Sequence, residues 1–256
     1  MKTFCIIFST LFFAQSIYSK PTNKSFYQLR VYHLSSDAQV KATDQFLESA
    51  YLPALHKLGI KNIGVFKPIA NDTASDKRIY VLISFSSPAQ WLTISNKINS
   101  DPAFSATAKD FLSADSKTPP FVRMESILLD AFPKQSFLLL PKQKNPEQVF
   151  ELRSYESPTL HLAQKKMGMF NKDEINIFNR LGFDPVFYGK VVSGSRMPNL
   201  MYMPVFKSVE DRNAAWKIFG NDPKWKEIST DPANENNVSV NHIDSILMHS
   251  TSYSDY

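Results

Sequence analysis

The chain of 256 residues has only one cysteine, Cys5, which lies near its start. Because Cys5 falls within a segment that we expect to be cleaved, the mature chain has no thiol. Disulfides, thiol nucleophiles and thiolate metal sites are therefore excluded. Glycine is also scarce, with seven residues. There is no glycine-rich phosphate loop and no serine–histidine–acid signature, so the sequence does not support the kinase, dinucleotide-binding or hydrolase classes.

Long hydrophobic runs are limited to one, over residues 4–14, which follows Lys2. A positive start, a short apolar run and small residues after it are typical of a cleavable secretory signal, here residues 1–19. We expect cleavage after Ser16 or Ser19 and export to the periplasm or the extracellular space. An uncleaved anchor is the alternative. No later run reaches the about 20 apolar residues that a spanning helix needs, so no stable membrane span is predicted.

A strong charge of one sign is missing as well. The formal net charge is +5, and the lysines are scattered along the chain. A dense basic run with interleaved aromatic residues, which a nucleic-acid surface would need, is not found, so no nucleic-acid partner is expected. The hydrophobic fraction of 43% is enough for an exported chain to be held by its own core.

The strongest pattern in the sequence is an internal repeat. Residues 26–32 (FYQLRVY) are matched by residues 149–155 (VFELRSY) at an offset of 123 positions. Three further pairs follow in the same order with offsets of 119 to 123: Leu58-Gly59 with Leu181-Gly182, Asp101-Pro102 with Asp222-Pro223, and Ser126-Ile127-Leu128 with Ser245-Ile246-Leu247. Ordered matches at nearly constant spacing indicate a duplicated unit of about 120 residues.

Each unit has the pattern strand, helix, strand, strand, helix, strand, which is the order of the ferredoxin-like fold. Helical spacing predicts a long helix over 36–58 and its counterpart over 159–181, and the last strand is expected over 238–248. We divide the mature chain into a first ferredoxin-like domain at 24–133, a linker at 134–146 and a second ferredoxin-like domain at 147–256.

The predicted fold class is therefore α+β. A ferredoxin-like unit places both helices on one face of its sheet and leaves the other face uncovered. Two copies in one chain can bury these open faces against each other. This predicts two repeats packed sheet to sheet within one chain.

The repeated motifs resemble those of the NIPSNAP family, whose first strand reads roughly Y-E-L-R-x-Y and whose second helix leads into D-P-x-W. Residues 27–32 and 150–155 carry the first motif, residues 222–225 (DPKW) carry the second, and residues 101–104 (DPAF) are a looser version. The resemblance covers both units and is nearest to exported bacterial tandem forms. It implies that the two repeats form an intramolecular pseudo-dimeric α/β barrel with a cleft between the sheets. The dimeric α/β barrel fold is shared by monooxygenases, haem-handling enzymes and isomerases, so the resemblance implies no particular reaction.

The chain departs from the family pattern in two elements. The family usually has a His and a Trp in the third strand, where this chain carries Val81 and Ile83 in one unit and Tyr202 and Pro204 in the other. In the second helix, Trp91 replaces the usual Arg in the first unit, whereas Arg212 keeps it in the second. A function that depends on the His-Trp pair is not implied here.

Alternation along the first strand of each unit sorts its side chains between two faces. We expect the apolar face, which includes Leu29 and Leu152, to meet the helices. The polar face would then point into the cleft, together with acidic residues of the last strands. The candidate ligand-binding residues are Arg30, Tyr32, Glu125, Glu151, Arg153, Tyr155 and Asp244.

These residues have two interpretations. In the first, Arg30 approaches Glu125 and Arg153 approaches Asp244 or Glu151, and together they form the polar floor of a cleft that binds an anionic or hydroxylated small molecule. Tyr32 and Tyr155 would donate hydrogen bonds to it. In the second, they are ion pairs that fix how the two sheets register, because a buried charge is costly unless it is paired.

We expect a non-catalytic protein that binds a small molecule or a protein partner through the cleft. The alternative is a cofactor-independent monooxygenase or isomerase, in which Glu151, Asp244 or Glu125 moves a proton. No cofactor is expected. The five histidines show no metal-site spacing, so no protein-built metal site is predicted, while one axial histidine for haem stays open.

Two further features have mainly structural interpretations. Asp101-Pro102 and Asp222-Pro223 are typical of a helix N-cap followed by proline in the first turn. Glu174 falls within a predicted helix and is expected to be a solvated position. The alternative is a base of raised pKa.

Overall fold

The computed structural model describes residues 24–142, 145–231, 234 and 236–256. The expected signal segment at 1–19 lies outside these residues. The strands close into a barrel in the order β1-β3-β2-β8-β5-β7-β6-β4. They are β1 (Phe26–Leu34), β2 (Gly64–Pro68), β3 (Lys77–Phe85), β4 (Arg123–Ala131), β5 (Val149–Glu156), β6 (Asp184–Ser193), β7 (Asn199–Phe206) and β8 (His242–Ser250).

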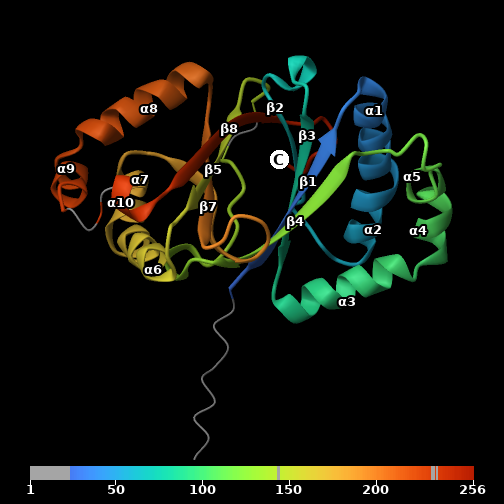
Figure 1. The fold of residues 1–256 in the computed structure, drawn as a ribbon, viewed down its shortest axis with the longest axis horizontal. Coiled ribbons are helices and arrows are strands. Elements are labelled where there is room, and N and C mark those ends of the chain that lie inside the picture. The colour runs from blue at the N-terminus through green and yellow to red at the C-terminus, as the bar shows by residue number, and fades with distance from the viewer. Residues whose placement is uncertain (1–23, 143–144, 232–233, 235) are drawn as a thin grey trace, which may run out of the picture.

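The helices lie outside the barrel, those of the first repeat on one side and those of the second on the other (Figure 1). The first repeat contributes α1 (Asp37–Phe46), η1 (Leu47–Tyr51), α2 (Leu52–Lys57), η2 (Asn71–Thr73), α3 (Pro88–Asn99), α4 (Pro102–Thr107) and α5 (Lys109–Leu112). After η3 (Pro133–Gln135), the second repeat contributes α6 (Leu160–Met169), η4 (Phe170–Glu174), α7 (Ile175–Arg180), α8 (Val209–Asn221), α9 (Pro223–Ser229) and α10 (Asn236–Ser239).

The predicted fold is confirmed, with one addition. Each repeat forms the ferredoxin-like sheet order, β4-β1-β3-β2 in the first and β8-β5-β7-β6 in the second. The two sheets face each other and are also joined along their edges, because β2 pairs with β8 and β4 pairs with β6. The barrel thus has no free strand edge, a state that protects a sheet from pairing with other chains.

The direction of the strands brings equivalent ends of both repeats to one mouth of the barrel. Every neighbouring pair is antiparallel, so β1 and β5, four places apart in the ring, run parallel. The ends of β1 and β5, the starts of β4 and β8, and the β2–β3 and β6–β7 hairpins therefore surround the same mouth.

The opposite end of the barrel is closed by side chains. Tyr256 is 5% exposed, and its ring lies 5.4 Å from that of Phe66 and 6.0 Å from that of Phe150. The backbone N–H of Leu139 donates to the carbonyl of Val186 at 2.9 Å and so fixes this part of the expected linker against β6. The neighbouring Leu138 packs on the same core. The barrel is therefore closed at this end.

Local signals in the sequence explain most helix boundaries. Asp101 accepts a hydrogen bond from the backbone of Ala103, and Asp222 accepts bonds from Lys224 and Trp225, with proline in the first turn each time. This confirms the predicted caps. The strand expected over 238–248 begins later, at His242, because the preceding residues form α10. Both long helices are interrupted at equivalent places by the π-helical turns η1 and η4.

Candidate functional site

The two faces of β1 and β5 are oriented opposite to our expectation: the apolar face lies inside the barrel and the polar face lies beneath the helices. Leu29 and Leu152 lie in the core inside the barrel, whereas Tyr32 and Tyr155 lie in the cores beneath the helices. By alternation, Arg30, Glu151 and Arg153 share the helix side. The prediction that these five polar residues line the cleft between the sheets is therefore wrong.

The physical reason is that both faces of these strands are buried. Eight of the nine residues of β1 are buried, so alternation between water and core is absent and the pattern alone cannot assign the faces. The interior of an eight-stranded barrel is just wide enough for side chains to fill it. Apolar residues fill most of that space, while the polar residues find partners on the helices.

In the second repeat, Glu151 is the centre of a buried ionic network. It is fully buried and receives hydrogen bonds from Arg153 at 2.7 Å and from Arg212 at 2.6 and 2.9 Å. Trp216 and Ser245 each donate to it at 2.6 Å. Burial by itself would raise the pKa of Glu151, but the bonds from Arg212 and Ser245, with the charge of Arg153, lower that pKa to about 2.

The equivalent position in the first repeat has no carboxylate. Gln28 stands where the second repeat has Glu151, and it donates to Ser126 at 2.7 Å. The guanidinium of Arg30 lies 4.5 Å above the ring centre of Tyr51, a cation–π contact. The expected approach of Arg30 to Glu125 does not occur, because β1 and β4 place Arg30 opposite Ser126 and put Glu125 on the other face.

Glu174 is buried, which contradicts its expected solvated position. It is 2% exposed and lies in the π-helical turn η4. Burial raises the pKa of Glu174 to about 7, although the charges of Lys166 and Arg153 oppose the rise. Its Oε2 atom has no hydrogen-bond partner among the described residues. The alternative interpretation, a carboxyl of raised pKa, is the one that agrees with the structure.

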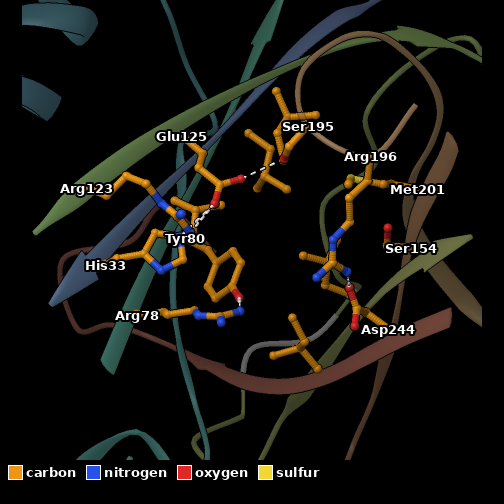
Figure 2. A pocket seen from close by; sticks show the side chains of 15 residues that line it. His33, Arg78, Tyr80, Arg123, Glu125, Ser154, Ser195, Arg196, Met201 and Asp244 are labelled. Atoms are coloured by element: carbon orange, nitrogen blue, oxygen red, sulfur yellow. Dashed lines mark hydrogen bonds and ion pairs between the residues drawn. The ribbon is translucent and has the colours of Figure 1, made fainter. Parts of the chain in front are cut away.

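A hollow of about 320 Å³ opens at the barrel mouth and is called the cup below. Figure 2 shows its side chains converging from both repeats. Its floor is apolar and its rim is charged. The cup is lined by Leu29, Val31, His33, Arg78, Tyr80, Arg123, Glu125, Ile127, Leu152, Ser154, Ser195, Arg196, Met201, Asp244 and Ile246. Of the seven candidate residues, the structure therefore places Glu125 and Asp244 in the cup.

Ion pairs surround the cup. Glu125 contacts Nε2 of His33 and Nη2 of Arg123, each at 2.9 Å, and accepts from Ser195 at 2.8 Å. Partial burial would raise the pKa of Glu125, but hydrogen bonds from Ser195 and His33 lower it, so this carboxyl is ionised near neutral pH. Asp244 accepts a hydrogen bond from Arg196.

Four cup residues were not predicted from the sequence: His33, Arg78, Ser195 and Arg196. His33 and Arg78 are at the mouth ends of β1 and β3, and alternation from Leu29 through Val31 to His33 was the signal that could have found the first of them. Ser195 and Arg196 lie in the β6–β7 hairpin, where no periodicity indicates direction.

The part of the chain that the structure describes has neither a metal-binding cluster nor a membrane-spanning helix. No group of three or more His, Cys, Asp or Glu side chains in that part of the chain is placed to hold a metal ion. Within the same residues, no helix has the length and apolar character needed to cross a bilayer.

The fold and the cup define a dimeric α/β barrel whose two halves lie in one chain. Residues 150–255, within the second repeat, match the model of the NIPSNAP family, in agreement with the resemblance that the motifs indicated. A search of curated proteins finds no match to the chain.

Two solved structures of low sequence identity share this fold over most of the chain, and a third is similar to part of it. A candidate monooxygenase from Lactobacillus acidophilus NCFM has a TM-score of 0.57 at 13% identity, over 89% of this chain and 94% of its own. One from Fusobacterium nucleatum has a TM-score of 0.57 at 6% identity, over 90% and 93%. An uncharacterised NIPSNAP-like domain protein from Burkholderia xenovorans has a TM-score of 0.38 at 16% identity, over 43% of this chain and 90% of its own.

Proposed function

We propose that this protein is an exported binding protein that holds a small organic molecule in the cup. The observation that carries the proposal is the hollow of about 320 Å³ at the barrel mouth. Small-molecule sites are concave, mostly apolar and furnished with a few polar groups that fix orientation, and their volumes begin at about 300 Å³. The cup has this size, and it combines an apolar floor with a rim that carries more polar and charged groups than such sites usually have.

Binding suits the cup better than proton transfer does. Fold neighbours described as candidate monooxygenases make a cofactor-independent oxygenase or isomerase the second candidate. His33 also lines the cup, but both of its ring nitrogens are engaged, by Asp76 and by Glu125, so the base would be one of the two carboxyl groups there, Glu125 or Asp244. Both are ion-paired, and an ionised carboxylate held by arginine is a weak base.

Filling the cup tests the proposal. Ile246 lies on β8 and lines the cup, so Ile246→Trp should occupy the space where a ligand would sit. We expect metabolites that raise the melting temperature of the wild type in a thermal-shift screen to lose that effect, with binding at least tenfold weaker by calorimetry. The matched control is Ile243→Trp, on the same strand but the other face and 40% exposed. Ligand shifts that survive in Ile246→Trp, or a wild type that binds nothing in the screen, would refute the proposal.

Export forms part of the same proposal, supported by the apolar run and the positive residue at the start of the chain. We expect mass spectrometry of the protein secreted by a bacterial host to give a mature start at Ile17 or Lys20, after cleavage at Ser16 or Ser19. Recovery of the chain only with its first residues intact would contradict cleavage and favour the anchor.

A further inference from the structure

We propose, building on the proposed function, that the ligand of the cup is an organic carboxylate with an apolar body. Its carboxylate is held by the guanidinium group of Arg196, while Arg123 adds positive charge on the opposite side of the rim. Some hydrogen-bonding groups at the cup already have protein partners and others do not, and this difference indicates which ligand the cup can hold.

The carboxylate oxygens around the cup are already engaged. Oε1 of Glu125 contacts His33 and Arg123, and Oε2 accepts from Ser195. Oδ1 of Asp244 contacts His242 at 3.0 Å, and Oδ2 accepts from Arg196. Behind the rim, Asp76 is engaged by Arg78 and His33. An incoming ammonium group would therefore compete with arginine for every carboxylate.

The guanidinium donors are only partly engaged. Among the described residues, Arg196 makes its hydrogen bond through Nη1, to Asp244, and Arg123 makes its contacts through Nη2, to Glu125 and His33. The remaining N–H groups of both side chains have no acceptor there. A guanidinium carries five donors in a planar fork and a carboxylate carries only acceptors, so the two match.

The backbone of the β6–β7 hairpin positions Arg196 at the mouth. Arg196 has φ of +60°, a left-handed conformation that is uncommon for a residue with a Cβ atom. The neighbouring Ser195 holds the hairpin to β4 of the first repeat through Glu125, and Arg196 reaches β8 of the second repeat through Asp244. In Figure 2 the guanidinium of Arg196 extends from the hairpin into the cup. The hairpin thus places one arginine between both halves of the barrel.

The floor specifies the rest of the ligand. Leu29, Leu152 and Ile127 are buried side chains of the barrel core that also line the cup. Apolar surface gains free energy when it leaves water for such an environment. A ligand with an aromatic or aliphatic body and an acidic group at one end therefore satisfies floor and rim together.

Three probes share one naphthyl body and differ in the charge of their end group, so they separate the effect of charge on affinity from the effect of shape. They are 1-naphthylacetate, 1-naphthylacetamide and 2-(1-naphthyl)ethylamine, titrated into the mature chain by calorimetry at pH 7.5. We expect the carboxylate to bind at least tenfold more tightly than the amide, and the amine to bind more weakly than the amide. In Arg196→Gln the carboxylate should lose at least tenfold in affinity and the amide less than twofold. Arg180→Gln is the control, because Arg180 is a half-exposed arginine that pairs with Asp222 elsewhere on the surface.

The outcomes distinguish this inference from the proposed function. Equal binding of carboxylate and amide, or tighter binding of the amine, would overturn the carboxylate assignment and leave the cup as the binding site. The same holds if none of the three probes binds while other compounds from the metabolite screen still respond to Ile246→Trp. An equal loss in Arg196→Gln and Arg180→Gln would show that overall charge, rather than Arg196, governs the affinity.

Discussion

Replacing Glu151 by Gln is expected to destabilise the protein by about 3–5 kcal/mol at pH 7, the range measured when one partner of a buried ion pair is removed. The substitution leaves the guanidiniums of Arg153 and Arg212, which are 15% and 22% exposed, without their shared carboxylate. Urea unfolding followed by circular dichroism measures the loss. Glu227→Gln, at an exposed surface pair, should change the free energy of unfolding by less than about 0.5 kcal/mol.

Two refinements make the result specific. The pKa of Glu151 is lowered to about 2 in the folded state from a usual value of 4.5, so its stabilising effect is present above pH 4.5 and is lost as pH falls through 2. The difference in free energy of unfolding between wild type and Glu151→Gln should therefore become smaller in acid. Adding Arg212→Gln to Glu151→Gln removes the second charge and leaves glutamine beside one arginine, as in the first repeat, so part of the lost stability should return. A loss below about 1 kcal/mol for the single variant would contradict the prediction.

Replacing Glu174 by Gln is expected to stabilise the protein at pH 8 by roughly 2 kcal/mol and to have little effect at pH 4. The folded pKa of Glu174 is raised from 4.5 to about 7, a difference of about 3 kcal/mol between the charged and neutral forms. The expected stabilisation is smaller than this difference, because the glutamine amide of the variant is still a buried polar group. Below pH 4.5 Glu174 is neutral in the folded state, and its contribution to stability is fully present. This contribution is lost as pH rises through 7, because the buried carboxyl must then ionise. The free energy of unfolding of the wild type should therefore fall between pH 4.5 and 7.

Urea unfolding of both proteins at pH 4, 6 and 8 measures this change. The matched control is Glu48→Gln, an exposed glutamate in the equivalent π-helical turn η1, which should show no comparable pH dependence. A carbon-13 titration of the Glu174 carboxyl gives its pKa directly. A value near 4.5, or a Glu174→Gln variant that is less stable than the wild type at pH 8, would contradict the prediction.

Repetition and alternation predicted most of the fold because they record local chemistry. The duplicated strand motif and the Asp-Pro caps identified the two units, and the uncovered sheet faces predicted how these units pack. The strand pairs that close the barrel, β2 with β8 and β4 with β6, were not predicted. Pairing between distant edges depends on backbone groups that every residue has, so it leaves no residue-specific pattern.

The site was harder to predict for three physical reasons. Strands buried on both faces gave no contrast between water and core, which reversed the faces of β1 and β5. Glu174 was misplaced because a carboxylate is rarely buried, although its spacing of four residues from both Phe170 and Phe178 puts it on the buried face of the helix. Arg196 lies in a hairpin, where direction depends on one backbone dihedral angle. Glu125 and Asp244 were correctly grouped with the open face because the last strands keep exposed residues near the mouth.

The parallel course of β1 and β5 has a consequence for how a guest molecule would be oriented. Equivalent positions of the two repeats meet around one mouth, and some match closely: Leu29 with Leu152, Ile127 with Ile246, and Glu125 with Asp244. Others differ, with Val31 opposite Ser154 and Tyr80 opposite Met201. Two identical subunits would offer an unsymmetrical guest two poses of equal energy, related by a half-turn about the barrel axis. A fused pair removes that degeneracy, because each half can diverge from the other and favour a single pose.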